Sequence, residues 1–216
     1  MKSLISELKI SVLLTLVLLV LLCGVYPVAV WAGAQAVFPD RANGSLLVDQ
    51  TGAVRGSRLL AQNFASAKYF HSRPSAAGTG YDATNSGGTN YGPTSAKLAN
   101  GAHAVDAKGQ PVNDPNNFDG IKDLIAAYRS DNGLPSETAV PADAVTRSGS
   151  GLDPHISVAN AQLQAARIAK TRNLPLAVVQ GLIAQETADR DFGIFGEPRV
   201  NVLTLNLALD RTPASP

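Results

Sequence analysis

The first strong pattern along the chain is an uncharged, apolar run near its N-terminus. No charged side chain lies between Lys9 and Asp40, and residues 10–30 contain seven Leu, six Val and one Ile. About 20 helical residues, at roughly 1.5 Å each, cross the ~30 Å hydrocarbon core of a bilayer. The run from Ile10 to Ala32 is therefore predicted to form a single transmembrane helix.

Two alternatives to an uncleaved anchor fit this run less well. A cleaved signal peptide has an apolar core of about 7–15 residues and a small-x-small exit. Ala32-Gly33-Ala34 supplies such an exit, but the apolar run is longer than that core. A lipoprotein needs a small residue before its modified cysteine, and Leu22 precedes Cys23. The pattern favours the anchor.

The cations that flank the run indicate its orientation. Lys2 and Lys9 precede it, and Arg41 is the first cation after it. The positive-inside rule then predicts a cytoplasmic N-terminus, residues 1–9, and an extracytoplasmic domain, residues 37–216. About 180 residues are enough to bury a core as one domain.

Beyond the anchor, the spacing of apolar residues predicts a hairpin and three helices. Residues 45–48 and 53–55 flank a Gly-containing turn, which is typical of a β-hairpin. Apolar positions at 3.6-residue spacing predict the helices. Their expected ends are Asn117 and Gly133 for the first helix, Ser157 and Asn173 for the second, and Pro175 and about Thr187 for the third. Residues 200–209 fit either an alternating strand or a helix capped by Asn201.

Three long polar segments interrupt these elements. Residues 71–95 have almost no aliphatic side chain, and loops this long are usually functional or disordered. Their aromatic and charged members indicate an ordered loop. Residues 99–117 are an exposed insertion, and residues 146–157 form a third, Gly/Ser-rich loop. The fold class expected is one transmembrane helix plus one mixed α/β extracytoplasmic domain with long Gly/Ser-rich loops.

Composition excludes several classes of site. The net charge is +1, with 18 basic and 17 acidic residues, so the basic stripe that nucleic-acid binding needs is missing. One cysteine excludes an intramolecular disulfide and a cysteine-based zinc cluster. The three widely spaced histidines make a His-rich metal site improbable. No nucleic-acid partner and no metal are expected.

The candidate catalytic residues do not form a self-sufficient set. His71, His103 and His155 are possible bases for an anchored Ser/His hydrolase, but the sequence has no Gly-x-Ser-x-Gly elbow. The Gly-rich run Ser148–Gly151 could form an anion-binding nest, although it lacks the Lys-Ser/Thr of a P-loop. The pattern favours an interaction subunit over an enzyme, and no catalytic residue is predicted.

Three blocks closely resemble the C subunit of the bacterial Kdp potassium-transporting P-type ATPase, the KdpC family. The first contains Tyr69-Phe70, Arg73-Pro-Ser-Ala-Ala-Gly-Thr-Gly-Tyr-Asp82 and Asn90. The second contains Ser148-Gly-Ser-Gly-Leu-Asp-Pro-His-Ile-Ser157, and the third Phe195-Gly-Glu-Pro-Arg-Val-Asn-Val-Leu203. The chain departs from the family pattern by about 20 extra residues near 99–117 and by Arg147, where a small residue is usual.

The resemblance implies an accessory subunit of an ATP-driven, high-affinity potassium uptake complex, needed for its assembly and activity. The implied partners are a channel-like potassium-binding subunit, a P-type ATPase subunit, a small single-span subunit and the lipid bilayer. The implied location is the bacterial inner membrane. ATP and potassium belong to the whole complex, and no cofactor is expected to bind this chain firmly.

The resemblance leaves two pictures of how the chain acts. In the picture that the predicted topology favours, the domain caps the external mouth of the channel-like subunit, and the docking loop contains Tyr69, Phe70, Arg73, Tyr81, Asp82 and Asn90. In the other, the chain is a catalytic chaperone that raises the ATP affinity of the P-type subunit. Its candidate nucleotide contacts are Ser148, Gly149, Ser150, Gly151, Gln162 and Gln164, and it requires a cytoplasmic domain.

Overall fold

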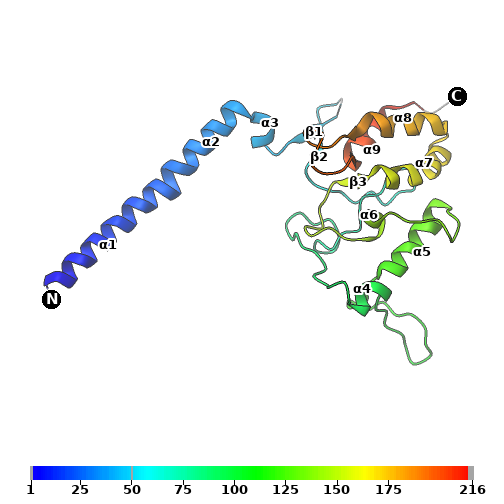
Figure 1. Ribbon diagram of the computed structural model, residues 1–216, viewed down its shortest axis with the longest axis horizontal. Helices are drawn as coiled ribbons and strands as arrows, with labels where there is room; N and C mark the ends of the chain where they lie inside the picture. Colours follow the sequence, from blue (N-terminus) through cyan, green and yellow to red (C-terminus); the bar gives the residue numbers. More distant parts are fainter. Residues whose placement is uncertain (1, 50, 214–216) are drawn as a thin grey trace. The chain divides into compact units, whose positions relative to one another are not determined.

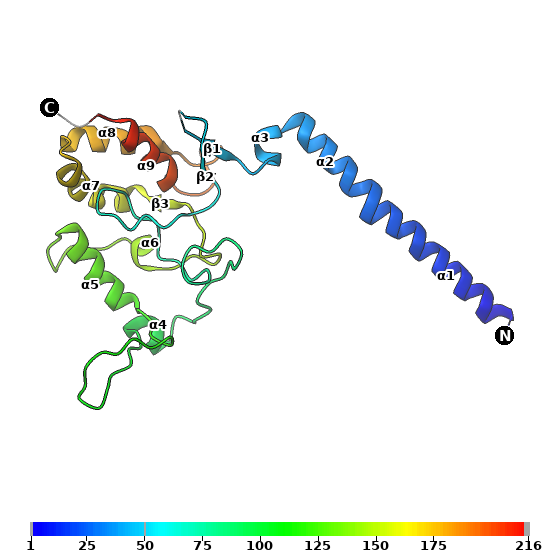
Figure 2. The same ribbon diagram turned by 180° about the vertical axis from the view of Figure 1, so that it is seen from behind.

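The computed structural model of the chain describes residues 2–49 and 51–213 (Figure 1; Figure 2). Contacts between Cα atoms divide the chain into two units, and the boundary along the sequence lies between Ser57 and Arg58. The predicted border between anchor and domain lies near residue 37. The structure therefore groups the predicted hairpin with the anchor.

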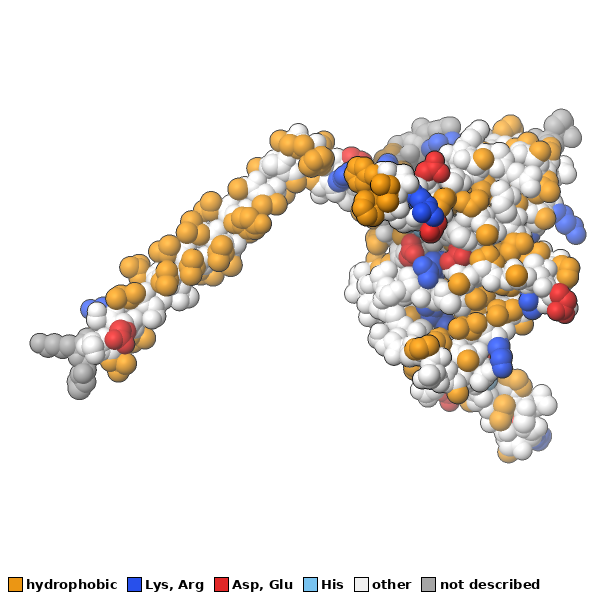
Figure 3. Space-filling model, viewed as in Figure 1, with side chains coloured by type: hydrophobic (Ala, Val, Ile, Leu, Met, Phe, Trp, Pro, Cys, Tyr) orange, Lys and Arg blue, Asp and Glu red, His pale blue; other side chains and the backbone are white. Residues whose placement is uncertain are grey.

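The N-terminal unit is built on one long apolar helix. It consists of α1 (Lys2–Val20), the π-helical turn η1 (Leu21–Val25) and α2 (Tyr26–Val37). In the part of the chain that the structure describes, this is the one helix long and apolar enough to cross a membrane. Figure 3 shows hydrophobic side chains along its length, and the helix extends beyond the predicted bounds at both ends.

The π-helical turn ends at Val25, two residues before Pro27. At this turn Tyr26 N–H donates to Leu21 O, five residues earlier. A proline lacks the N–H of a regular helix, and its ring collides with the carbonyl four residues before it. The wider turn relieves that collision. Ser11 and Thr15 each return their hydroxyl to the carbonyl four residues earlier, at 2.9 and 2.8 Å.

The same unit ends in the predicted hairpin. After α3 (Pro39–Ala42), β1 (Leu46–Val48) pairs antiparallel with β2 (Val54–Ser57). The Asp49 carboxylate accepts from Thr51 N–H at 2.8 Å and from Ala53 N–H at 3.0 Å, which closes the connection. Residue 50, within the predicted turn, lies outside the described residues.

The second unit packs helices against one small sheet. Its elements are α4 (Ala96–Asn100), α5 (Ile121–Asn132), α6 (Ala142–Val145), β3 (His155–Ser157), α7 (Val158–Arg172), α8 (Leu176–Glu186), β4 (Thr187–Ala188), β5 (Arg199–Asn201) and α9 (Val202–Arg211). The antiparallel sheet has the order β3-β5-β4. Helix α8 packs against both α7 and α9 (Figure 1).

The core of this unit lies among α7, α8, α9 and the sheet. Its fully buried members include Ile168, Ile183, Leu205 and Leu209. The Phe70 ring joins them from the long segment 58–95, which has neither helix nor strand. The irregular segment predicted at 71–95 is thus a loop, as expected, and its N-terminal end is tied into the core.

Most predicted helix ends are confirmed, and one is wrong. Ser157 caps α7, and Gly133 and Asn173 end α5 and α7 in left-handed conformations. Helix α5 begins after Gly120, not at Asn117. The Asp123 carboxylate accepts from Gly120 N–H at 2.8 Å, so the first turn is closed without Asn117.

In the ambiguous tail, the helix interpretation is confirmed. Arg199–Asn201 form β5, and Asn201 then caps α9 by accepting from Leu203 and Thr204 N–H. The alternating-strand interpretation is wrong beyond Asn201, because Val202, Leu205 and Leu209 are buried at helical spacing on one face of α9.

The predicted insertion 99–117 forms an extended, hairpin-like excursion beside α4 (Figure 2). Isolated bridges join Ala102 to Phe118 and Val105 to Pro111. The Asn117 side chain accepts from Ala104 N–H at 2.7 Å and donates to Val112 O at 2.8 Å. Asn117 thus closes the excursion internally, which is why it is not available as a helix cap.

Candidate functional site

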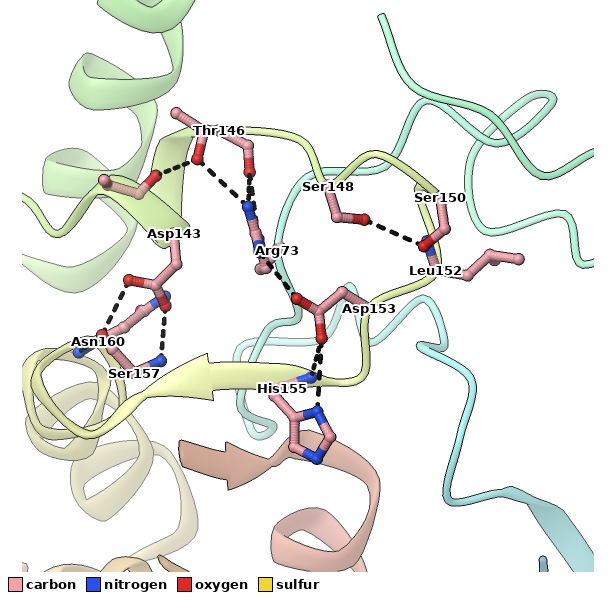
Figure 4. Close-up of polar contacts among 11 residues, drawn as sticks. Arg73, Asp143, Thr146, Ser148, Ser150, Leu152, Asp153, His155, Ser157 and Asn160 are labelled. Carbon is pink, nitrogen blue, oxygen red and sulfur yellow. Dashed lines mark hydrogen bonds and ion pairs between the residues drawn. The ribbon is translucent and has the colours of Figure 1, made fainter. Parts of the chain in front are cut away.

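Arg73 joins two of the long loops. Its guanidinium donates to Asp153 Oδ2 at 2.8 Å and reaches Thr146 O at 3.4 Å (Figure 4). Asp153 also accepts from the backbone and ring of His155, at 3.0 and 3.5 Å. The His155 ring, together with the backbone bonds and Arg73, lowers the pKa of Asp153 to about 2. Arg73 therefore fixes loop 71–95 to the segment 146–155.

Tyr81 and Asp82 shape the loop from within. The Tyr81 hydroxyl donates to Arg73 O at 2.7 Å, and Tyr81 N–H donates to Ser75 Oγ at 2.9 Å. Burial raises the pKa of this phenol. The Asp82 carboxylate accepts from Thr84 N–H and Thr84 Oγ1, at 2.9 and 2.7 Å, and these bonds lower its pKa. Both side chains use their hydrogen bonds to stabilise the conformation of the loop itself.

The other three predicted docking residues have separate surroundings. The half-buried Tyr69 ring lies under the Arg172 guanidinium, 4.8 Å from its centroid, and its hydroxyl donates to Asp210 at 3.1 Å. Phe70 is fully buried, so its ring packs the core and has no surface to offer a partner. Asn90 is exposed, with a positive φ of 56°. The six residues do not share one exposed face.

Two buried amide side chains form hydrogen bonds with the backbone of Phe70 and His71. Asn206 of α9 accepts from Phe70 N–H and donates to Phe70 O, both at 2.9 Å. Gln164 of α7 accepts from His71 N–H at 2.8 Å and donates to His71 O at 3.2 Å. Gln164 also accepts from the buried Arg167 guanidinium at 2.9 Å. Gln164 is thus a structural residue of the core.

The Gly-rich run Ser148–Gly151 packs on loop 71–95 through its backbone. Ser150 O accepts from Gly87 N–H and Ser86 Oγ, both at 2.9 Å. Gly151 N–H donates to Ser148 O at 3.2 Å, and Leu152 N–H to Ser150 Oγ at 3.1 Å. These two backbone donors are used inside the protein. Gln162 is exposed on α7, whereas Gln164 is buried, so the predicted nucleotide contacts are not assembled at one place.

A small cavity of about 210 Å³ lies beside Gln164 and the backbone of His71. Its lining includes His71, Tyr128, Asn160 and Gln164. The Tyr128 hydroxyl already donates to Asn160 Oδ1 at 2.8 Å, and burial raises the pKa of that phenol. Burial lowers the pKa of His71, which favours the neutral ring. The volume is below the roughly 300–1,000 Å³ of pockets that enclose drug-sized ligands.

His103, Asp119 and Asp123 form a cluster of potential metal ligands. Their ligand atoms lie within 4.8 Å of one another. His103 Nε2 lies 3.0 Å from Asp123 Oδ2, and this hydrogen bond lowers the pKa of the carboxyl. The same oxygen also accepts from Gly120 N–H. The contacts present tie the insertion 99–117 to the start of α5.

The three candidate histidines each face a carbonyl or a carboxylate. His71 Nε2 lies 3.2 Å from Ser66 O, while His103 and His155 lie beside Asp123 and Asp153. A carbonyl oxygen can only accept, so His71 Nε2 carries the hydrogen. These contacts orient loops. They do not correspond to the base-and-nucleophile pair that Ser/His catalysis requires.

One exposed feature was missed in the sequence. Phe192, Ile194 and Phe195 protrude from the connection between β4 and β5, and we call these three side chains the apolar tip. The signal was present: three large apolar residues stand in a short loop flanked by charges. Without a regular period, the run fitted neither a strand nor a helix face.

Comparison with known proteins identifies the family. A family model described as "KdpC: K+-transporting ATPase, c chain" matches residues 8–211. The chain belongs to the KdpC family. As a member, it is an accessory subunit of a potassium-transporting ATPase, as the three sequence blocks indicated.

Curated relatives agree over most of the chain. A Mycobacterium tuberculosis protein named "Potassium-transporting ATPase KdpC subunit" is 49% identical over 187 residues, covering 87% of this chain and 88% of its own. Proteins of that name from Koribacter versatilis and Rhodospirillum rubrum are 45% identical over 207 residues and 49% over 193. They cover 95% and 89% of this chain, and the same shares of their own lengths.

Proposed function

We propose that this chain is a membrane-anchored assembly subunit that docks on the external face of the channel-like subunit of a Kdp complex. The observation that carries the proposal is the family match over residues 8–211 together with one long apolar helix before a separately packed unit. The bacterial inner membrane is the proposed location. The N-terminus is cytoplasmic, and the second unit lies outside.

The loop geometry supports an interaction role. Loop 71–95 is held by Arg73, Tyr81 and Asp82 through bonds within the protein, so its exposed residues are presented on a fixed scaffold. A preordered surface loses less conformational entropy when a partner binds. In this proposal Arg73, Tyr81 and Asp82 shape the docking loop, and exposed positions such as Asn90 contact the partner.

The catalytic-chaperone alternative has less support. The backbone donors of Gly151 and Leu152 are used internally, and Gln164 is buried in a bonded network. The neighbouring cavity of about 210 Å³ is small for a nucleotide. A nucleotide role would also require the second unit to face the cytoplasm.

Topology is the property to test. In a Cys23→Ser background, Ala83→Cys places a thiol at an exposed position of loop 71–95. We expect a membrane-impermeant maleimide to label this cysteine in intact cells. Ser3→Cys in the same background is the matched control, because it lies on the predicted cytoplasmic side and should label only after lysis.

The reverse labelling pattern would overturn the proposal. If Ala83→Cys labelled only after lysis while Ser3→Cys labelled in intact cells, the second unit would face the cytoplasm. The chaperone alternative would then be favoured.

A further inference from the structure

The apolar tip is the most exposed large hydrophobic group of the second unit. The exposed fractions of Phe192, Ile194 and Phe195 are 92%, 72% and 65%. Single exposed apolar residues are ordinary on protein surfaces, but a contiguous group commonly marks a contact with another molecule. Three such residues among four consecutive positions form a group of this kind.

The tip is held in one conformation by the loop that carries it. Asp191 N–H donates to Phe195 O at 2.8 Å, and Phe195 N–H donates back to Asp191 O at 2.9 Å. Ion pairs then clamp both sides of the turn, Arg190 to Glu197 at 2.6 Å and Arg199 to Asp191 at 3.0 Å. Binding through the tip therefore requires little further ordering of the backbone.

The charges around the tip indicate the chemistry of its partner. Arg190 in the loop and Arg199 at the start of β5 are each paired with a carboxylate of the loop, and Asp189 adds a further negative charge. Segments that insert into membrane surfaces carry an excess of Lys and Arg for anionic lipids. This rim has no such excess. It complements an uncharged surface and disfavours an anionic one.

We propose that the apolar tip inserts into an uncharged, apolar recess on the external face of the channel-like subunit of the same potassium-transporting complex. The inference rests on the proposed function and names the surface through which the assembly contact is made. An aromatic and aliphatic centre inside a polar rim is the usual anatomy of such a contact. A few central side chains of this type commonly supply most of the binding energy.

The first test compares the tip with another exposed apolar pair of the second unit. The tip variant is Phe192→Asn, Ile194→Ser and Phe195→Ser combined, with Asn chosen because it tolerates the positive φ of residue 192. The control is Val105→Ser with Val112→Ser, whose side chains in the insertion are 59% and 38% exposed. The full chain, tagged and co-expressed with the other Kdp subunits, is purified from membranes.

We expect the tip variant to recover at least about tenfold less of the partner subunits than the control, the change that loss of an interface hot spot gives. Both variants should keep the wild-type melting temperature. Equal recovery by the tip variant and the control would overturn the inference. If even the wild-type chain recovered no partner subunit, the proposed function itself would fail.

A second measurement identifies what covers the tip. Ile194→Cys in the Cys23→Ser chain carries an environment-sensitive dye, and the purified complex is placed in lipid nanodiscs. We expect a blue shift relative to the chain alone in the same nanodiscs, without quenching by lipid-attached quenchers. Quenching by the lipids would show that the bilayer covers the tip, and an absent shift would show that nothing does. Either result would overturn the inference.

Discussion

At the scale of single residues, Gly151 decides how closely two long loops approach. Its φ of +68° lies in the left-handed region, and a Cβ there would lie 2.6 Å from Gly87 O and 2.7 Å from Ala77 N. Ser75 Oγ also donates to Gly151 O at 2.6 Å. The contact therefore needs both the conformational freedom and the small size of glycine.

We predict that Gly151→Ala lowers the free energy of unfolding by about 2–4 kcal/mol, since it combines a left-handed backbone with overpacking. Gly149→Ala is the matched control, because a Cβ there meets nothing within 4 Å. It should change stability by no more than about 0.5 kcal/mol. Thermal melts of the detergent-solubilised chain would measure both, and equal melting temperatures for the two variants would contradict the prediction.

At the scale of elements, side chains of α7 and α9 form hydrogen bonds with the backbone of an irregular segment, as a neighbouring strand would. Gln164 and Asn206 pair with both backbone groups of His71 and Phe70, respectively. Buried backbone donors and acceptors require partners, and among the described residues no neighbouring strand supplies them for Phe70 and His71. Two amide side chains therefore supply the backbone hydrogen bonds that a β-ladder would supply. They fix the position of the backbone at the start of loop 71–95.

Replacing one of these amides should be costly. We predict that Gln164→Leu lowers the free energy of unfolding by about 3–5 kcal/mol, because His71 N–H, His71 O and Arg167 each lose a partner at 1–3 kcal/mol or so apiece. Gln162→Leu, two residues away on the exposed face of α7, serves as control and should be nearly neutral. Urea denaturation of both variants is the measurement, and a neutral Gln164→Leu would refute this account.

Elements with local signals were predictable from the sequence. Ser157, Asn173 and Gly133 act through their own side chain or backbone, so the ends of α5 and α7 followed from residue type. The start of α5 did not, because Asn117 is used by the insertion instead. The three strands of the second unit have two or three residues each, and only pairing with distant segments defines them.

The candidate site was harder to predict for a related reason. Composition predicted a long loop at 71–95, and the structure shows neither helix nor strand there. Its aromatic and charged members indicated an ordered loop, and Arg73, Tyr81 and Asp82 do make contacts within the protein. Whether Tyr81 or Asp82 points toward solvent depends on Arg73, Ser75 and Thr84, and periodicity does not encode that choice. Phe70 was predicted to be a docking residue, but Asn206 binds its backbone and its ring is buried in the core.

At the scale of the whole molecule, the two units have separate sources of stability. The buried cluster of the second unit is drawn from Phe70 through Leu209, all within the unit that begins at Arg58. The N-terminal helix has no buried residue within its candidate span, as expected for a segment solvated by lipid. Folding of the second unit should therefore not need the helix.

We predict that a fragment beginning at Arg58 is soluble without detergent and unfolds in one cooperative transition, because it holds its own core. Near-UV circular dichroism and a urea titration would check this. A fragment beginning at Phe70 is the useful comparison. It lacks residues 58–69, and with them the backbone carbonyls of Ala67 and Tyr69 that accept from the Arg167 guanidinium. A broad, non-cooperative transition for the longer fragment would contradict the prediction.

The π-helical turn before Pro27 also changes how the spanning helix can meet its neighbours. One residue added to a helix of 3.6 residues per turn rotates everything after it by about 100°. The stripe that α1 presents to an adjacent helix is thus out of phase with the stripe presented by α2. A single straight neighbour cannot follow one continuous seam along both halves. The helix is suited to contact two different neighbours in succession, one along α1 and one along α2.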